Sequence, residues 1–383
     1  MVGSAAPVVI VGAGVMGLGL AWRLAAAGRE VLVLERGTPG REASWAAAGM
    51  LAPHAEIEFH EHELLAFAAE SQRRWPAFVA ALEAASGAVV GHDRTGTLVP
   101  ALDRDDVETL ARLFEYQRSE GLDVQWLDGD ACRDLEPLLS PRVAGAIHAP
   151  GDHQVDNRAF VDALRLAALG AGAVVRTDAE VASVAVDAGA VSAVVLADGE
   201  RIAAAGVAVC AGAWSAGLGG LDVHRPPTRP VKGQMVALGF DPAAPVLRHV
   251  VRAPDAYLVP KASGRLVIGA TSEERGFDRT ITGGGLFELL RGAWDTLPIV
   301  YELEVLETWV GFRPGSRDNL PILGGCSVDG LWFATGHYRN GIQQAPASIE
   351  LVADAMLGGD PAPVLAPFTI ERFARRRAAR RAR

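Results

Sequence analysis

The sequence predicts a two-domain α/β protein, and three observations support this prediction. The chain has 383 residues, which is more than a single hydrophobic core usually serves. A strand, a glycine-rich turn, a helix and a second strand follow one another within the first 35 residues. Short β-rich runs dominate the middle of the chain, and a strand, a glycine and a helix return near its end. We therefore expect one domain assembled from separated segments and a second, β-rich domain laid over it.

The first elements form a βαβ unit. Val8–Val11 is a short, continuous apolar run, typical of a parallel strand that is buried on both faces. The turn GAGVMG at 12–17 follows it, and residues 18–28 are strong helix formers that stop at a glycine. Residues 30–34 predict a second strand, and Glu35 follows directly after it. A unit of this kind requires a right-handed crossover.

Helical periodicity returns four times further along the chain. Apolar residues recur at three- and four-residue steps in residues 63–82, 107–120 and 157–169, as on the buried face of an amphipathic helix. Asp156 stands where the N-cap of the third of these helices would lie. A fourth helix is expected to begin near Ala345.

Extended structure is expected between these helices. The predicted segments are 173–210 with a hairpin turn at Asp198-Gly199, 231–310 with hairpin arms at 257–261 and 265–270, and 331–334.

Composition excludes several classes of function. Apolar residues make up 50% and charged residues 21% of the chain, which is ordinary for a globular enzyme and not for a disordered chain. The formal net charge of −10 argues against a nucleic-acid partner. No apolar run approaches the ~20 residues that span a bilayer. The apolar start of the chain resembles a strand and not a signal peptide.

The cysteines and the basic end of the chain are consistent with a cytoplasmic location. Cys132, Cys210 and Cys326 stand far apart and form no CxxC motif, as expected in a reducing compartment. The tail 371–383 is strongly basic, and a solvated, frayed terminal helix is the expected structure.

The glycine turn predicts a bound dinucleotide. In GAGVMG, Gly12 permits a tight turn, Gly14 permits close approach of a pyrophosphate, and Gly17 permits close packing of helix and strand. The helix N-terminus supplies an anion site. Glu35 lies 18 positions after Gly17, where a carboxylate can accept hydrogen bonds from an adenosine ribose. These residues form a Rossmann fingerprint, which does not separate FAD from NAD.

Two further segments favour FAD. Residues 44–51 read SWAAAGML, and such small side chains let backbone amides approach a flat ring closely. Residues 333–342 read FATGHYRNGI, in which a strand ends at Thr-Gly and another glycine precedes a helix. This arrangement builds a second positive helix end at a polar cofactor, for which an NAD enzyme has no evident need.

With these segments the chain resembles the D-amino-acid oxidase-like flavoproteins, and among them the glycine oxidases of thiamine biosynthesis. The matching motifs span nearly the whole chain in family order. They are VVIVGAGVMG at 8–17, the strand before Glu35, AAAGML at 46–51 followed by HAE at 54–56, CAGAWS at 210–215, RPVKGQ at 229–234, YLVP at 257–260, GRLVIGAT at 264–271, GFRPG at 311–315 and GHYRNGI at 336–342.

The resemblance implies an FAD-binding, Rossmann-like domain of the glutathione-reductase type and a β-rich α+β substrate domain. We assign residues 1–88, 150–228 and 318–370 to the discontinuous FAD-binding domain, 89–149 and 229–317 to the substrate-binding domain, and 371–383 to the basic tail.

The resemblance also implies the residues of the site. Arg313 corresponds to the arginine that binds the substrate carboxylate, Tyr257 to a tyrosine that reaches the same carboxylate, and Arg339 to an arginine near the flavin ring. A structural ion pair is the alternative for each arginine. The residues implied to hold FAD without a covalent bond are Gly12, Gly14, Val15, Met16, Gly17, Glu35, Arg36, Ser44, Ala47, Ala48, Gly49, Met50, Val181, Gly212, Trp214, His337, Arg339, Asn340, Gly341 and Ile342.

The implied reaction is the oxidative deamination of glycine or of a small amine or amino acid. A hydride leaves the α-carbon for flavin N5, the imine is hydrolysed to glyoxylate or a keto acid and ammonia, and oxygen reoxidises the flavin to give H2O2. In thiamine synthesis the imine would feed the thiazole ring. Glycine, sarcosine and small D-amino acids stay open as substrates, because one methyl group changes binding by only ~1–3 kcal/mol.

Other functions stay open beside this one. They are a D-amino-acid dehydrogenase that passes electrons to a quinone, a sarcosine oxidase-like enzyme, a non-catalytic flavin-binding subunit and an NAD dehydrogenase. No G-x-S-x-G nucleophile motif is present in the sequence. A homo-oligomer is compatible with the family.

Two further ligand hypotheses are weaker. His54, Glu56, Glu58, His60, His62 and Glu63 form a His/Glu cluster, but its spacing matches no HExxH metal signature. Cys326 raises the question of covalent flavin, yet related sarcosine oxidases carry their linking cysteine in the segment that here reads GFRPGSRDNLP. Cys326 is therefore expected to serve packing.

The chain departs from the family at two places near the expected pocket. Ser272 is small and polar where relatives often place a larger apolar residue over the substrate. Residues 254–256 before Tyr257 also differ. Both departures bear on substrate choice and leave the predicted fold unchanged.

Overall fold

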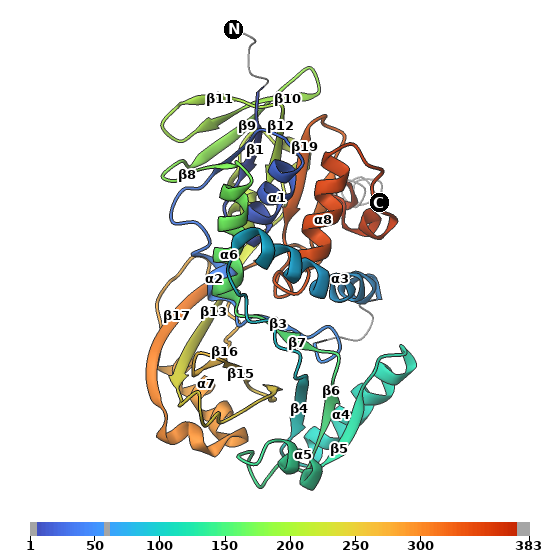
Figure 1. Cartoon of the computed structure of the whole chain (residues 1–383), viewed down its shortest axis with the longest axis vertical. Coiled ribbons are helices and arrows are strands. Elements are labelled where there is room, and N and C mark those ends of the chain that lie inside the picture. Colours follow the sequence, from blue (N-terminus) through green and yellow to red (C-terminus); the bar gives the residue numbers. More distant parts are fainter. Residues whose placement is uncertain (1–5, 57–61, 374–383) are drawn as a thin grey trace, which may run out of the picture.

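Six strands form the first sheet of the protein, in the upper half of Figure 1. The structure is a computed structural model that describes residues 6–56 and 62–373. The strand order is β18-β19-β12-β1-β2-β8, and all neighbours run parallel except the antiparallel pair β18–β19. The strands are β1 (Val8–Val11), β2 (Val31–Leu34), β8 (Val174–Arg176), β12 (Gly206–Val209), β18 (Ile322–Gly325) and β19 (Leu331–Thr335).

Helices cover one face of this sheet and a small sheet covers the other. Alternate residues of β1 face different layers: Val8 and Ile10 pack with the helices, whereas Val9 and Val11 pack with the small sheet. Burial on both faces explains why β1 is a continuous apolar run. The helices are α1 (Val15–Ala26), α3 (His62–Ser86), α6 (Asn157–Gly170) and α8 (Ala345–Met356), and the small antiparallel sheet contains β9 (Val181–Asp187), β10 (Ala190–Leu196) and β11 (Arg201–Ala203).

An eight-stranded sheet forms the lower half of the molecule (Figure 1). Its order is β17-β13-β16-β15-β14-β4-β6-β5, and its neighbours are antiparallel except the parallel pair β14–β4. The strands are β4 (Thr97–Ala101), β5 (Gln125–Asp128), β6 (Gly145–Ala149), β13 (Arg229–Gly239), β14 (Val250–Arg252), β15 (Tyr257–Lys261), β16 (Arg265–Gly269) and β17 (Glu304–Gly315).

The two faces of this sheet have different neighbours. One face packs against α5 (Gly129–Leu135) and α7 (Gly283–Thr296). Part of the other face packs against the short helix α2 (Ala43–Ala46) and the segment after it. The remaining elements are α4 (Arg104–Ser119), the paired strands β3 (Met50–Leu51) and β7 (His153–Gln154), and the 3-10 helices η1 (Gly212–Gly217), η2 (Asp222–His224), η3 (Pro298–Glu302) and η4 (Pro363–Phe368).

Most predicted elements are confirmed, with shifted ends. Helix α1 begins at Val15, within the glycine turn, and not at residue 18. Asp156 is the N-cap of α6, and its carboxylate accepts hydrogen bonds from the backbone N–H groups of Arg158 and Ala159. The turn at Asp198-Gly199 joins β10 to β11. Helix α7 was not predicted: it lies within residues 231–310, where only strands were expected.

The strands of each sheet come from different parts of the chain. The first sheet takes its strands from within 1–88, 150–228 and 318–370, and the eight-stranded sheet from within 89–149 and 229–317. The domain boundaries themselves stay a proposal. The last ten residues of the basic tail, 374–383, lie outside the described residues. Within the described part of the chain, no helix is long and apolar enough to cross a membrane.

Candidate functional site

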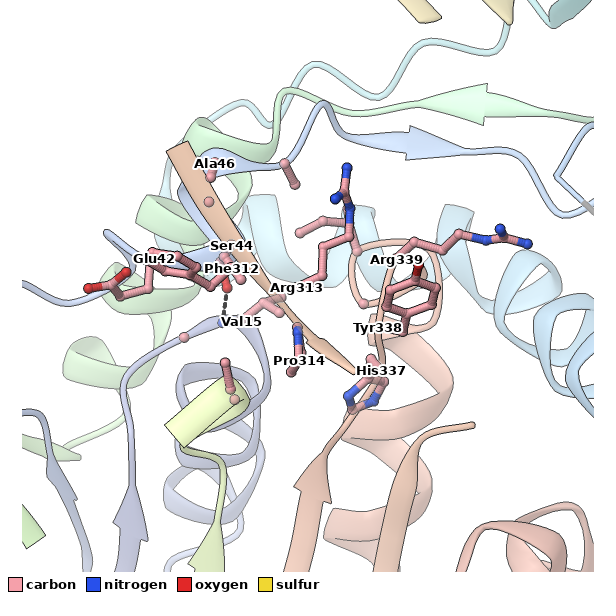
Figure 2. A pocket seen from close by; sticks show the side chains of 18 of the residues that line it. Val15, Glu42, Ser44, Ala46, Phe312, Arg313, Pro314, His337, Tyr338 and Arg339 are labelled. Carbon is pink, nitrogen blue, oxygen red and sulfur yellow. Dashed lines mark hydrogen bonds between the residues drawn. The ribbon is translucent and has the colours of Figure 1, made fainter. Parts of the chain in front are cut away.

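A cavity of about 800 Å³ lies between the two sheets and is lined by residues from both. Its size falls in the range of sites for cofactors and small molecules. Residues that follow β1, β2 and β12 line one part, and residues of β13, β14, β15 and β17 line another. Figure 2 shows that side chains from the β17 strand and from the loop at 337–339 are directed into the same region as Val15 and Ser44.

The predicted site residues gather at this cavity with two exceptions. Gly17 and Asn340 do not line it. The lining residues among those predicted are Gly12, Gly14, Val15, Met16, Glu35, Arg36, Ser44, Ala47, Ala48, Gly49, Met50, Val181, Gly212, Trp214, Tyr257, Arg313, His337, Arg339, Gly341 and Ile342.

The glycine turn brings the N-terminus of α1 to the cavity. Gly12 has a φ of +101°, and a Cβ atom there would lie 2.7 Å from the carbonyl oxygen of Cys210. Gly17 lies behind the turn, where a Cβ atom would come within 1.9 Å of the Gly12 oxygen. Gly17 therefore serves packing and does not face the cavity. The positive end of α1 is left facing the cavity, as an anion site requires.

Glu35 holds the backbone around the turn. Its carboxylate accepts hydrogen bonds from the N–H groups of Ala13 at 2.8 Å and Gly37 at 2.9 Å. Each carboxylate oxygen can accept a further hydrogen bond, so Glu35 remains able to bind ligand hydroxyls. The guanidinium of Arg36 lies 4.0 Å from the centre of the Trp214 ring, and both residues line the cavity.

The small-residue segment is fixed by side chains from two distant elements. Asn157 of α6 donates hydrogen bonds to the carbonyl oxygens of Ser44 at 2.9 Å and Trp45 at 3.0 Å. The indole N–H of Trp309 on β17 donates to the carbonyl oxygen of Ala46 at 3.0 Å. The backbone that follows is therefore presented to the cavity in one defined position.

Arg313 projects from β17 into the cavity (Figure 2). Its Nη1 atom donates to the carbonyl oxygen of Thr271 at 3.0 Å. The guanidinium lies against Gly233, where a Cβ atom would be only 2.8 Å from Nη1. Glycine at this position gives the guanidinium its space, and a carbonyl oxygen fixes one of its edges.

Tyr257 supplies a neutral hydroxyl to the same cavity. Burial raises the pKa of Tyr257 to about 12, although the nearby Arg313 charge acts in the opposite direction. The phenol therefore stays protonated at neutral pH. Its hydroxyl donates to the Met235 sulfur at 3.3 Å, and a thioether is a weak acceptor.

Arg339 and His337 come from the loop after β19. The Nη2 atom of Arg339 donates to the carbonyl oxygen of Glu56 at 3.2 Å, and its side chain extends away from that of Arg313 in Figure 2. The role of Arg339 at a flavin ring stays a proposal. Burial lowers the pKa of His337 to about 3, so this imidazole is neutral, and its Nε2 atom pairs with the Ser348 hydroxyl at 3.0 Å.

Sequence reasoning missed several lining residues. Arg252, Met235 and Glu42 line the cavity, and none stands in a motif that marks it in the sequence. Phe312 also lines it and belongs to the GFRPG motif, but it was not singled out as a site residue. Residues 254–256 and Ser272, the two places where the chain departs from the family, also line it.

Among the described residues of the weaker ligand hypotheses, only Glu56 lines this cavity. His54 pairs with the buried Asp152 at 3.0 Å, and Glu58 and His60 lie outside the described residues. Cys326 does not line the cavity, and burial raises the pKa of its thiol to about 11. Its sulfur lies with ligand atoms of His224 and Glu371, all within 4.8 Å of one another.

Comparisons with known proteins identify the family. Residues 7–355 match the family described as DAO, FAD dependent oxidoreductase. The glycine oxidase of Geobacillus kaustophilus is 36% identical over 371 residues, which cover 95% of this chain and 96% of that protein. A bifunctional protein ThiO/ThiG of Synechocystis sp. is also 36% identical, and the match covers 96% of this chain and 54% of that protein.

Solved structures agree with the sequence relatives. A crystal structure of glycine oxidase from Geobacillus kaustophilus matches with a TM-score of 0.89 and covers 95% of this chain and 98% of its own. The structure of iminodiacetate oxidase from Chelativorans sp. BNC1 matches at 29% identity with a TM-score of 0.86, covering 94% and 98% of the two chains. This chain therefore belongs to the D-amino-acid oxidase-like family of FAD-dependent oxidoreductases.

Proposed function

We propose that this protein is an FAD-dependent oxidase that converts glycine, or a small relative of glycine, to the corresponding imine. One observation carries the proposal. Arg313 and Tyr257 meet in the same cavity that receives the N-terminus of α1 and the carboxylate of Glu35. A carboxylate clamp and a dinucleotide-binding turn in one cavity fit an enzyme that brings an amino acid to a flavin.

The residues that line the cavity fit FAD. The turn at Gly12 leaves no room for a side chain beside Cys210, the positive end of α1 suits a pyrophosphate, and Glu35 suits a ribose. Ala47, Ala48 and Gly49 offer backbone without bulky side chains. When bound, FAD supplies the acceptor for the hydride of the substrate.

The chain's own contribution is to bind and orient the substrate. A planar guanidinium can grip a carboxylate with two parallel hydrogen bonds, and Arg313 has one edge fixed by Thr271 before any substrate arrives. Tyr257 adds a hydroxyl donor without adding charge. Together they fix the α-carbon relative to the cofactor, and such positioning can account for several kcal/mol of a barrier.

The similar proteins support glycine as the substrate. The relatives described above are named glycine oxidase and ThiO/ThiG, and on this basis we propose that the imine serves the thiazole ring of thiamine. We also propose that oxygen is the electron acceptor, with H2O2 as its product. The cytoplasmic location and a homo-oligomeric state stay predictions from the sequence.

A visible spectrum tests the proposal. The purified protein is expected to show a flavin spectrum that bleaches when glycine is added without air and returns, with H2O2, when air is admitted. If the colour returns only when a quinone or dye is added, the protein is a dehydrogenase and not an oxidase. A flavin spectrum that ignores glycine, sarcosine and small D-amino acids would overturn the proposed function.

A further inference from the structure

Arg252 lies directly opposite Tyr257 on the neighbouring strand. In the antiparallel pair β14–β15, Val251 pairs with Leu258 and Arg252 pairs with Tyr257. Val251 and Leu258 are fully buried in the core that α7 covers. Because side chains alternate along a strand, Arg252 and Tyr257 both point to the opposite face, and both line the cavity.

The guanidinium of Arg252 has no hydrogen-bond or ion-pair partner among residues 6–56 and 62–373. Two other arginines that line the cavity differ in this respect: Arg313 donates to Thr271 and Arg339 to Glu56. The acid nearest in sequence, Asp255, lies 4.0 Å from Arg291 instead. Arg252 is only partly exposed. A guanidinium in this position is ready to bind an anion that enters the cavity.

The cavity also has space beside the carboxylate clamp. Ser272 directly follows Thr271, whose carbonyl oxygen fixes Arg313, and Ser272 lines the cavity. Its side chain is small and takes up little of the cavity. A substrate larger than glycine can therefore occupy the region between Arg313, Tyr257 and Arg252.

We propose that Arg252 binds a second carboxylate of the substrate, so that the enzyme prefers amino dicarboxylates to their neutral counterparts. Directly opposite residues on paired strands have Cβ atoms only ~5 Å apart, so the reach of an arginine side chain covers the space around Tyr257. Arg313 and Tyr257 hold the first carboxylate, and Arg252 holds the second. This inference rests on the proposed oxidase function.

The second carboxylate can stand at either of two positions in the substrate and still reach Arg252. It can stand on the substrate nitrogen, as in iminodiacetate, or on the side chain of the α-carbon, as in D-aspartate. Each has a matched neutral partner: N-methylglycine for iminodiacetate and D-asparagine for D-aspartate. Turnover of the two pairs therefore tells where the second carboxylate lies.

The test is the ratio of kcat/KM for the dicarboxylate to kcat/KM for its neutral partner. We expect a preference of at least tenfold for the dicarboxylate in one of the two pairs. Arg252→Ala should lower this ratio at least tenfold, and Arg252→Lys should keep part of it, because a lysine retains the charge but not the planar fork. FAD content and folding of each variant are followed by the visible spectrum.

Arg248→Ala is the matched control. Arg248 lies four residues away and is exposed, and it does not line the cavity, so its removal deletes one charge and should leave the ratio unchanged. Inhibition of the wild-type enzyme supplies a second measurement that needs no variant: succinate should inhibit at least tenfold more strongly than butyrate.

Several results would overturn the inference. They are equal or better turnover of the neutral member in both pairs, an unchanged ratio in Arg252→Ala, or loss of FAD as the main effect of that substitution. If glycine bleaches the flavin while neither pair shows a preference, only this inference fails. If no amine bleaches the flavin, the proposed function fails with it.

Discussion

Arg313 is fixed along one edge of its guanidinium and open to the cavity along the other. The Thr271 carbonyl oxygen accepts a hydrogen bond from Nη1, and Gly233 leaves space beneath the group. We predict that Arg313→Ala lowers kcat/KM for glycine by an amount equivalent to about 2–5 kcal/mol, because a bidentate, charge-assisted contact is lost. Steady-state kinetics measure the loss, and the visible spectrum shows whether FAD stays bound.

Arg313→Lys separates charge from geometry in this prediction. Lysine keeps the charge but cannot donate two parallel hydrogen bonds, so its activity should lie between those of the wild type and Arg313→Ala. Near-normal turnover of glycine by the alanine variant would remove Arg313 from the site.

Glu35 holds the backbone of the turn, a role that the sequence did not indicate, beside its proposed role at a ribose. It was expected to bind a ribose, and in the structure it also accepts hydrogen bonds from Ala13 and Gly37. We predict that Glu35→Ala weakens FAD binding at least tenfold and also lowers the melting temperature of the apoprotein, because the turn loses two contacts. Titration of the apoprotein with FAD, followed by flavin fluorescence, measures the affinity. Unchanged affinity would contradict the ribose role.

The residues found from the sequence differ in kind from those that were missed. Arg313, Tyr257 and the glycine turn stand in contiguous motifs, whose chemistry can be inferred without a structure. Arg252 becomes visible as a site residue only when β14 is paired with β15, and Met235 only when β13 is paired with its neighbours in the sheet. Both depend on pairings between strands, which a local pattern does not encode.

At the level of elements, the N-cap of α6 offers a direct test. Asp156 accepts hydrogen bonds from the N–H groups of Arg158 and Ala159. Asp156→Ala should lower the free energy of unfolding by about 1 kcal/mol, since the first turn loses its cap. Asp162→Ala is the control, because Asp162 is exposed in the same helix and caps nothing. Urea unfolding compares the two variants, and equal effects would contradict the capping role.

Elements with strong periodicity or burial on both faces were predicted well. Strand β1 and the helices α3 and α6 lie where the apolar pattern placed them. Helix α7 was missed because it begins with Gly283, Gly284 and Gly285, and glycine disfavours helices in isolation. Thr282 caps this helix, and its apolar face packs against the eight-stranded sheet. Tertiary packing therefore decides the structure of this segment.

At the scale of the whole molecule, Lys261 links the eight-stranded sheet to β7 and to the residue after it. It ends β15 and is buried, and its Nζ atom donates to the Gln154 side chain at 3.1 Å and to the Val155 carbonyl oxygen at 2.8 Å. Gln154 in turn donates to the carbonyl oxygen of Pro260 at 2.8 Å. Burial lowers the pKa of Lys261 to about 7.

This lysine makes stability depend on pH. Between pH 7 and the unfolded pKa of 10.5, the unfolded chain holds a proton that the folded protein does not. The contribution of Lys261 to the free energy of unfolding therefore rises with pH across this window, by at most ~1.4 kcal/mol per pH unit. Below pH 7 both states carry the charge, and the full cost of burying it is present.

Lys261→Met removes this titration. Urea unfolding at pH 7, 8 and 9 should show a smaller rise of stability with pH in the variant than in the wild type. An identical pH dependence would mean that Lys261 keeps an ordinary pKa in the folded protein.

The strands of each sheet fall within the ranges that the resemblance implied for the two domains. The arrangement of strands within the second sheet was not predicted. Its parallel pair joins Thr97 and Leu98 of β4 to Val250 and Val251 of β14. About 150 residues separate these strands in the chain, and closing such a connection carries an entropic cost that no local signal reports.

The strand order of the first sheet has a consequence during synthesis. β1 leaves the ribosome long before β19, the last parallel strand of its sheet, which ends at Thr335. At ~5–20 residues per second, tens of seconds pass between the synthesis of β1 and that of β19, and the parallel part of the sheet stays incomplete for that time. During translation this protein should depend on chaperones that shield nascent chains, and it should capture its cofactor only once β19 and the cavity-lining loop after it have been made.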